Sequence, residues 1–80
     1  MTSSPFRFLT SRRQGQYSVR RGEEHIGYVT KIVHRISERG VTRTIIAGWA
    51  PSTLSGVDLA IESTREAAAR VLWYRHQAAR

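Results

Sequence analysis

The chain has 80 residues, which is enough for one small domain and too few for a second. Thirteen Lys and Arg residues against six Asp and Glu residues give a net charge of +7, which predicts an acidic partner. The absence of cysteine excludes disulfides, thiolate metal sites and a cysteine nucleophile. No apolar run approaches the roughly 18 residues of a membrane span, and the first residues do not resemble a signal peptide. We therefore expect a soluble cytoplasmic protein with no membrane partner.

Residues 1–15 are polar and basic, contain no acid, and are interrupted by Pro and Gly. This composition predicts a flexible basic N-terminal arm over residues 1–15, followed by a folded domain over residues 16–80. Within the arm, apolar residues alternate between Phe6 and Phe8, and this spacing also fits a short strand that docks on the domain.

Three segments rich in β-branched and aromatic residues follow, at residues 16–21, 25–36 and 41–50. Residues 22–23 have the composition of a two-residue turn with Gly in first position. Residues 37–40 are expected to close the second hairpin as a four-residue loop. Together these segments predict a three-stranded antiparallel sheet.

Residues 57–61 have the composition of a short fourth strand, and residues 64–78 are predicted to form a helix. Ser63 and Glu66 have the spacing of a capping box at its start. On a helical wheel one broad arc is apolar, and Trp73 falls on the opposite side. The expected fold is therefore a small α+β domain in which a three-stranded sheet, or a four-stranded one, carries a single C-terminal helix on one face.

The two turns set the register of the strands, and the register assigns side chains to the two faces of the sheet. The first turn places Tyr17 opposite Tyr28, and the second places Tyr28 opposite Trp49. Because opposite residues share a face, both hairpins predict the same apolar face, which the helix would cover. The predicted apolar face comprises Tyr17, Val19, Ile26, Tyr28, Ile32, Ile36, Val41, Ile45, Ala47 and Trp49.

The other face of the predicted sheet is open and carries cations and hydroxyl groups but no acid. Such a surface suits the phosphate backbone or the major groove of DNA. The first hypothesis is therefore a small nucleic-acid-binding protein, an accessory or regulatory factor for duplex DNA, that contacts phosphates through its arm and its open face. The predicted contacts are Arg7, Arg12, Arg13, Arg20, Lys31, Arg35, Thr42 and Thr44.

Val29, Val33 and Ile46 are β-branched apolar residues on the same predicted open face, which suggests that something covers them. The second hypothesis is a non-enzymatic protein-binding module, an inhibitor or adaptor, that docks on an acidic surface of a larger partner. Its apolar anchors would be these three residues and Trp73, with the Arg residues at the rim. A homodimer through this face is compatible with either hypothesis.

Catalysis is not expected. Ser, His and acidic residues are present, but no spacing links them into a triad, and a small two-layer fold offers little depth for a pocket. His25 and His34 lie nine residues apart on one predicted strand, so they face opposite ways and cannot share a metal ion. We therefore predict no catalytic residue, no metal site and no cofactor.

One set of residues occurs in the order seen in a known family: Tyr17, Arg20, Gly27, Val29 and residues 63–68. On these residues the layout resembles the plant ethylene-response-factor type of DNA-binding domain. The order of three strands and a helix also resembles the N-terminal arm-binding domain of some tyrosine recombinases. The chain departs from the first family at Trp49, which lies fourteen residues before Ser63 instead of a few residues before the helix. The resemblance concerns the fold alone and does not license a function, and no residue role is carried over.

Overall fold

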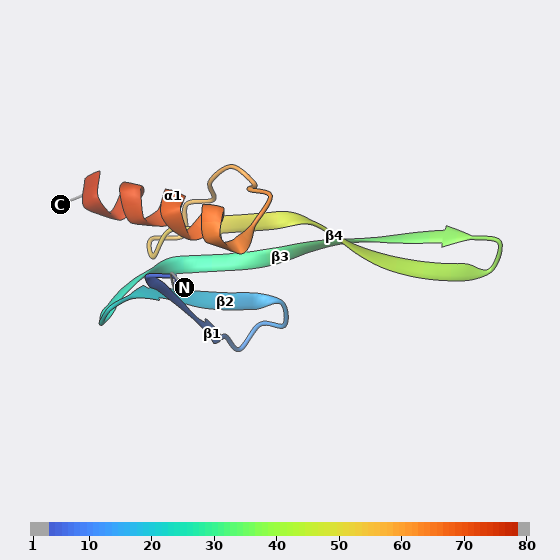
Figure 1. Ribbon diagram of the computed structural model, residues 1–80, viewed down its shortest axis with the longest axis horizontal. Helices are drawn as coiled ribbons and strands as arrows, with labels where there is room; N and C mark the ends of the chain where they lie inside the picture. Colours follow the sequence, from blue (N-terminus) through green and yellow to red (C-terminus); the bar gives the residue numbers. More distant parts are fainter. Residues whose placement is uncertain (1–3, 79–80) are drawn as a thin grey trace.

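Four strands and one helix make up residues 4–78, the part of the chain that the computed structural model describes (Figure 1). The strands form one antiparallel sheet in the order β1-β2-β3-β4, and the helix packs on one of its faces, which confirms the α+β fold. The elements are β1 (Phe6–Thr10), β2 (Gln16–Arg21), β3 (Glu24–Glu38), β4 (Val41–Ser52) and α1 (Arg65–Ala78).

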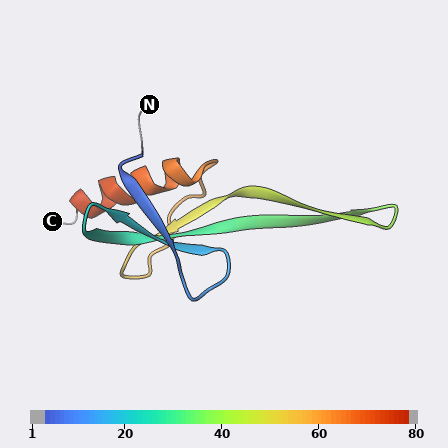
Figure 2. The ribbon, with the colours of Figure 1, turned by 60° about the horizontal axis from the view of Figure 1, so that its bottom comes forward.

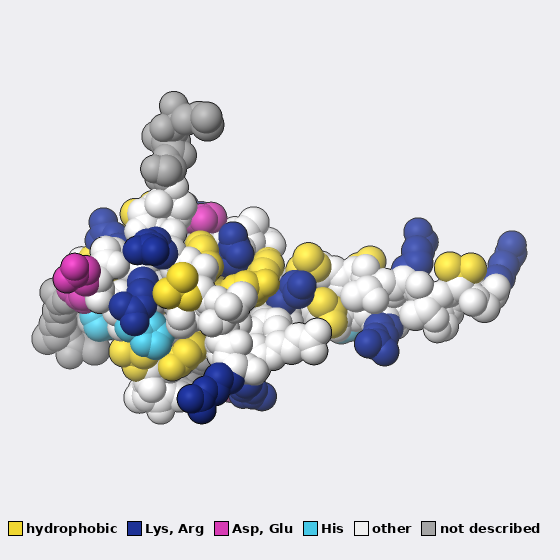
Figure 3. Space-filling model, turned by 90° about the horizontal axis from the view of Figure 1, so that it is seen from below, with side chains coloured by type: hydrophobic (Ala, Val, Ile, Leu, Met, Phe, Trp, Pro, Cys, Tyr) yellow, Lys and Arg dark blue, Asp and Glu magenta, His cyan; other side chains and the backbone are white. Residues whose placement is uncertain are grey.

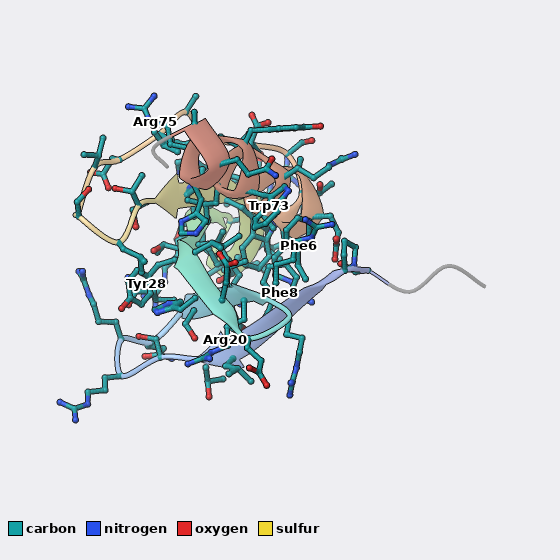
Figure 4. The ribbon with its side chains drawn as sticks, turned by 90° about the vertical axis from the view of Figure 1, so that its left-hand side faces the viewer. Phe6, Phe8, Arg20, Tyr28, Trp73 and Arg75 are labelled. Atoms are coloured by element: carbon teal, nitrogen blue, oxygen red, sulfur yellow. The ribbon has the colours of Figure 1, made fainter. Side chains whose placement is uncertain are left out.

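The fourth strand of the sheet is β1, which pairs with β2 along its whole length (Figure 2). Phe6 is buried between the sheet and the helix, and Phe8 packs against the same core (Figure 4). Burying these two rings offsets the entropy lost on ordering the segment. Residues 6–10 are thus a strand of the sheet instead of part of a flexible arm. The start of the expected arm, residues 1–3, lies outside the described residues.

Residues 57–61 do not form the predicted fourth strand. The segment touches the edge of β4 at two isolated bridges, where Asp58 lies opposite Ser52 and Glu62 lies opposite Trp49. Two backbone hydrogen bonds join Trp49 and Glu62, at 2.8 and 2.9 Å. This segment therefore covers the edge of β4 close to the helix and leaves the rest of that edge open.

A β-bulge at Ile26 changes the register of β3 against β2. Ile26 has no partner on β2, so Val19 lies opposite Gly27 instead of opposite Ile26, as the sequence had predicted. Ile26 and Gly27 are consequently both buried, although they are neighbours in the chain. A Cβ atom on Gly27 would lie 2.9 Å from Leu72 Cδ2, so the bare backbone here makes room for the helix.

The bulge reverses the predicted faces of the residues that follow it. Val29 is 0 % exposed and belongs to the core, whereas Tyr28 lies on the open face beside His25, with ring centroids 5.0 Å apart. The assignment of Val29 to the open face, as an anchor for a partner, is therefore wrong. Gly27 likewise faces the helix, while Arg20 lies on the open face as predicted.

The second hairpin closes with the two-residue turn Arg39-Gly40, in which φ is +53° and +79°. Two positive φ values identify a type I′ turn, which suits the twist of a hairpin. The predicted four-residue loop is wrong, and Val41 pairs with Glu38 instead of Ile36. Farther back, Ala47 has no partner on β3, because Gly48 lies opposite Ile32 and Ile46 lies opposite Val33, and this forms a second bulge.

The helix begins one residue later than the capping-box pattern suggests. Thr64 Oγ1 accepts a hydrogen bond of 3.0 Å from the Ala67 backbone N–H, so Thr64 and not Ser63 is the N-cap. Trp73 packs against the core, contrary to its predicted position on the outer side. Its neighbour Tyr74 is 67 % exposed.

Small residues let the helix lie close to the sheet. Ala68 and Ala69 are fully buried, and Leu72 fills the space above Gly27. The core is confined to the part of the sheet that the helix covers. Its residues are Phe6, Val19, Ile26, Val29, Ala68, Ala69 and Leu72.

Candidate nucleic-acid interface

The outer parts of β3 and β4 continue beyond the other strands as a two-stranded hairpin (Figure 1). We refer to residues 33–46 as the distal hairpin and to the other described residues as the body. Every residue of the distal hairpin is exposed. The projection makes the molecule 51 Å long and raises its radius of gyration to 14.2 Å, against about 11.6 Å for a compact chain of this length.

The distal hairpin has two different sides, because residues that pair across the strands share a side. One side continues the helix-covered face of the sheet, and we call it the groove side. It carries Val33, Arg35, Ser37, Thr42, Thr44 and Ile46. We call the opposite side the far side, and it carries His34, Ile36, Glu38, Val41, Arg43 and Ile45.

A basic groove lies at the base of the distal hairpin, on its groove side. Lys31 and Arg35 supply two cations to it, and Tyr17 supplies an aromatic wall whose ring lies 6.0 Å from that of Trp49. The Gly15 carbonyl accepts a hydrogen bond of 2.8 Å from the Lys31 N–H, which fixes the loop before β2 against β3. The basic groove has a volume of about 570 Å³ and is lined by Gln14, Gly15, Tyr17, Lys31, Val33 and Arg35.

Most of the charge on the distal hairpin is positive. Arg39 occupies its tip, and Glu38 is the only acid among residues 33–46. Figure 3 shows basic side chains spaced along the projection to its end, while the acidic side chains visible in that view lie on the body. On the body, Glu24 forms an ion pair of 2.8 Å with His76, and Glu66 accepts a hydrogen bond from Ser4.

The predicted phosphate contacts separate into two groups. Lys31 and Arg35 meet in the basic groove, and Thr42 and Thr44 follow on the groove side of the distal hairpin. Arg12 and Arg13 are exposed in the loop whose next two residues line the groove. Arg7 and Arg20 lie opposite each other on the other face of the sheet. The prediction that Arg20 shares one open face with Lys31 and Arg35 is therefore wrong, because the bulge in β3 exchanges the faces beyond it.

Sequence reasoning missed three contributors to this surface. Arg39 was placed inside a loop and was not considered as the tip of a hairpin. Tyr17 was assigned only to the core, although it also lines the groove. Gln14 was treated as part of the arm. The only sign of the Arg39-Gly40 turn in the sequence is Gly40, because Gly readily adopts the positive φ that a type I′ turn requires.

The four apolar anchors of the second hypothesis do not form one surface. Val33 and Ile46 lie opposite each other on the groove side, 43 % and 58 % exposed. Val29 is buried, and Trp73 is half-buried beneath Arg21, whose Cζ lies 4.2 Å from the centre of its ring. Of the four anchors, only Val33 and Ile46 are exposed side by side.

Some cations of the body are held on aromatic rings. Arg65 Cζ lies 4.2 Å from the centre of the Phe8 ring and 5.6 Å from that of Tyr17, and Arg21 covers Trp73 in the same way. Such cation–π contacts favour a fixed position for the guanidinium group. Within residues 4–78, Arg35 and Arg39 make no such ring contact, and they lie where the hairpin leaves the body and at its tip.

Among residues 4–78 no three His, Cys, Asp or Glu side chains lie close enough together to hold a metal ion. No helix in the same range is both long and apolar enough to cross a membrane. Comparisons of the chain with protein-family models, curated proteins and solved structures found no match.

Proposed function

We propose that the protein binds duplex DNA, with the distal hairpin in the major groove and the basic groove against the phosphate backbone. The observation that carries this proposal is a free, basic, two-stranded hairpin joined at its base to a second group of cations. A two-stranded β-ribbon is one of the elements that the major groove admits. The cations at its base supply contacts that fix its position on the duplex.

The dimensions support this placement. Two paired strands lie about 4.8 Å apart, and their side chains fit into a major groove about 12 Å wide. Six residues on each strand extend about 20 Å, which is long enough to follow the groove across several base pairs. The groove side would face the bases, since Arg35 and the hydroxyls of Thr42 and Thr44 are groups that recognise base edges and phosphates.

Five cations are positioned to meet phosphates: Arg12, Arg13, Lys31, Arg35 and Arg39. At about 0.9 per phosphate, they predict a slope near −4.5 for the logarithm of affinity against the logarithm of salt concentration. This slope corresponds to a loss of about 500-fold in affinity between 50 and 200 mM salt. Arg7 and Arg20 are not included, because they lie on the other face of the sheet.

The test is a fluorescence-anisotropy titration of labelled random-sequence duplex DNA at these two salt concentrations. Replacing Arg12 and Arg13 with Ala should flatten the slope by nearly two units. Replacing Arg7 and Arg20 with Ala removes the same charge from the other face and should leave the slope within about half a unit of wild type. Absence of binding at the lower salt concentration would contradict the proposal.

A second candidate function is binding to an acidic protein surface, supported by the exposed pair Val33 and Ile46 beside the basic groove. Val33→Asp distinguishes the two functions. Apolar anchors dominate protein interfaces, so this change should abolish protein binding, whereas it should weaken a phosphate-dominated complex by only about tenfold. The measurement is DNA affinity of the variant, with Thr44→Asp as a control of equal charge on the same side.

A further inference from the structure

We propose that two copies of the chain pair along the free edge of β3 in the distal hairpin, so that their hairpins form one continuous four-stranded antiparallel sheet. This inference concerns a different surface from the groove side, and its test requires no nucleic acid. It rests on the direction of backbone groups, on one apolar residue at the centre of the edge, and on a histidine and an acid that face each other across the seam.

The outer half of β3 has an unpaired edge. β2 pairs with β3 only as far as Thr30, and the last bond on that side joins Lys31 N–H to the Gly15 carbonyl. From Val33 to Ser37, no strand among residues 4–78 pairs with this edge. Because amide directions alternate along a strand, the N–H and C=O groups of Val33, Arg35 and Ser37 point outward, as those of Lys31 do.

Such an edge is a template for another strand. An isolated two-stranded hairpin is also marginally stable in water, so the distal hairpin gains from additional strands. The corresponding edge of β4 is less suitable. Its body end is covered by Glu62, and a two-fold axis at Arg43 would place like charges opposite each other.

The edge of β3 is self-complementary about Ile36. A two-fold axis at this residue pairs Arg35 with Ser37 of the second copy through their outward amides, which matches the antiparallel hydrogen-bond pattern. It places Ile36 against Ile36 of the second copy at a non-hydrogen-bonded position, where side chains are closest. The same axis sets Glu38 opposite His34 of the second copy, twice in the dimer. An acid and a base therefore meet at both ends of the seam.

The far side of the joined sheet gains a continuous apolar surface. Ile36 and Ile45 are 44 % and 46 % exposed in one copy and lie diagonally across the hairpin from each other. When the two copies pair at Ile36, the Ile36 and Ile45 side chains of both copies form one apolar surface. Because the two-fold axis is perpendicular to the sheet, both groove sides lie together on the opposite face. Four paired strands span about 14 Å, which is wider than a major groove of about 12 Å, so the dimer and the hairpin seated in the groove are alternative states.

The absence of cysteine from the chain allows a direct test by cross-linking. Residues opposite each other at a non-hydrogen-bonded position have Cα atoms about 4.5 Å apart, which is within the range of a disulfide. Ile36→Cys should therefore form a disulfide-linked dimer under mild oxidation at least about tenfold faster than Ile45→Cys. The control residue has similar exposure on the same side but lies one strand away from the seam. Equal rates for the two variants would overturn the proposal.

A charge exchange supplies the second test, by sedimentation velocity over a wide range of protein concentration. His34→Glu sets two pairs of like charges across the seam and should weaken dimerisation between about twofold and thirtyfold. The double variant His34→Glu with Glu38→Lys restores opposite charges and should recover the wild-type dissociation constant to within about twofold. Failure of the double variant to recover, with an unchanged circular-dichroism spectrum, would exclude this register.

Discussion

β3 is one continuous strand that passes through two different environments. Between Tyr28 and Thr30 it lies at the centre of the sheet, with β2 and β4 on either side, and Val29 is buried in the core beneath the helix. Between Val33 and Glu38 it has one neighbouring strand and no cover, and all of its side chains are exposed. The first part holds the protein together, whereas the second part presents its side chains to solvent.

The difference arises mainly from what lies beside the strand, since both parts are rich in β-branched residues. In the body, the small residues Gly27, Ala68 and Ala69 let the helix approach the sheet and exclude water. Beyond Ile32 neither β2 nor the helix reaches the strand. The same residue types that form a core in the first part therefore remain available for docking in the second.

The largest expected effect belongs to the body. Leu72→Ala should lower the free energy of unfolding by about 2–5 kcal/mol, because it opens a cavity above Gly27. Ile45→Ala in the distal hairpin should change it by less than about 0.5 kcal/mol. Urea denaturation followed by circular dichroism measures both. Similar losses for the two variants would mean that the hairpin contributes to the core, contrary to this division.

Shortening the distal hairpin should separate binding from folding. Deleting residues 34–37 and 42–45 together keeps the Arg39-Gly40 turn and the pairing of Val33 with Ile46. We expect the free energy of unfolding to stay within about 1 kcal/mol of wild type, since no core residue is lost. Affinity for duplex DNA at 50 mM salt should fall by at least about tenfold, because Arg35 is removed. Unchanged affinity in a folded variant would assign DNA binding to the body.

The smallest expected effect concerns Arg39, which adopts a positive φ of 53°. Asn accepts this conformation more readily than Arg, and Asn-Gly is the preferred type I′ pair. Arg39→Asn should therefore stabilise the distal hairpin by about 0.5–1 kcal/mol, measured as slower hydrogen exchange of its amides. The same variant should bind DNA several-fold more weakly. Stronger binding would show that rigidity of the hairpin matters more than the charge at its tip.

The sequence predicts the class of the fold well, because its signals are local. The β-branched segments, the Gly22 turn and the helix over residues 64–78 all appear in the structure with small shifts. The strand at residues 6–10 was visible as an alternation of Phe6 and Phe8, but the basic composition around it favoured an arm. Burial of Phe6 against the helix favours the strand over the arm, and this contact between distant parts of the chain cannot be read from the local sequence.

The predicted faces failed at the two bulges. A single unpaired residue, Ile26, exchanges the faces of the β3 residues that follow it and of the β4 residues paired with them as far as Ile46, whereas Trp49, beyond the second bulge, keeps its predicted face. The first bulge depends on the fit of Gly27 beneath Leu72. Nothing in the spacing of apolar residues in β3 records that fit. The sequence likewise contains no sign of the second bulge, at Ala47. The site was therefore predicted as a set of cations but not as a groove and a projecting hairpin.

The central claim is that the distal hairpin, and not the charge of the whole chain, carries DNA binding. The most direct test compares two double variants that each remove two positive charges: Arg35→Ala with Arg39→Asn on the hairpin, and Arg70→Ala with Arg75→Ala, both exposed on the helix. Titrated against random duplex DNA from 50 to 200 mM salt, the hairpin variant should have a slope flatter by about 1.8, and the helix variant should match wild type. Equal slopes for the two variants would contradict the account.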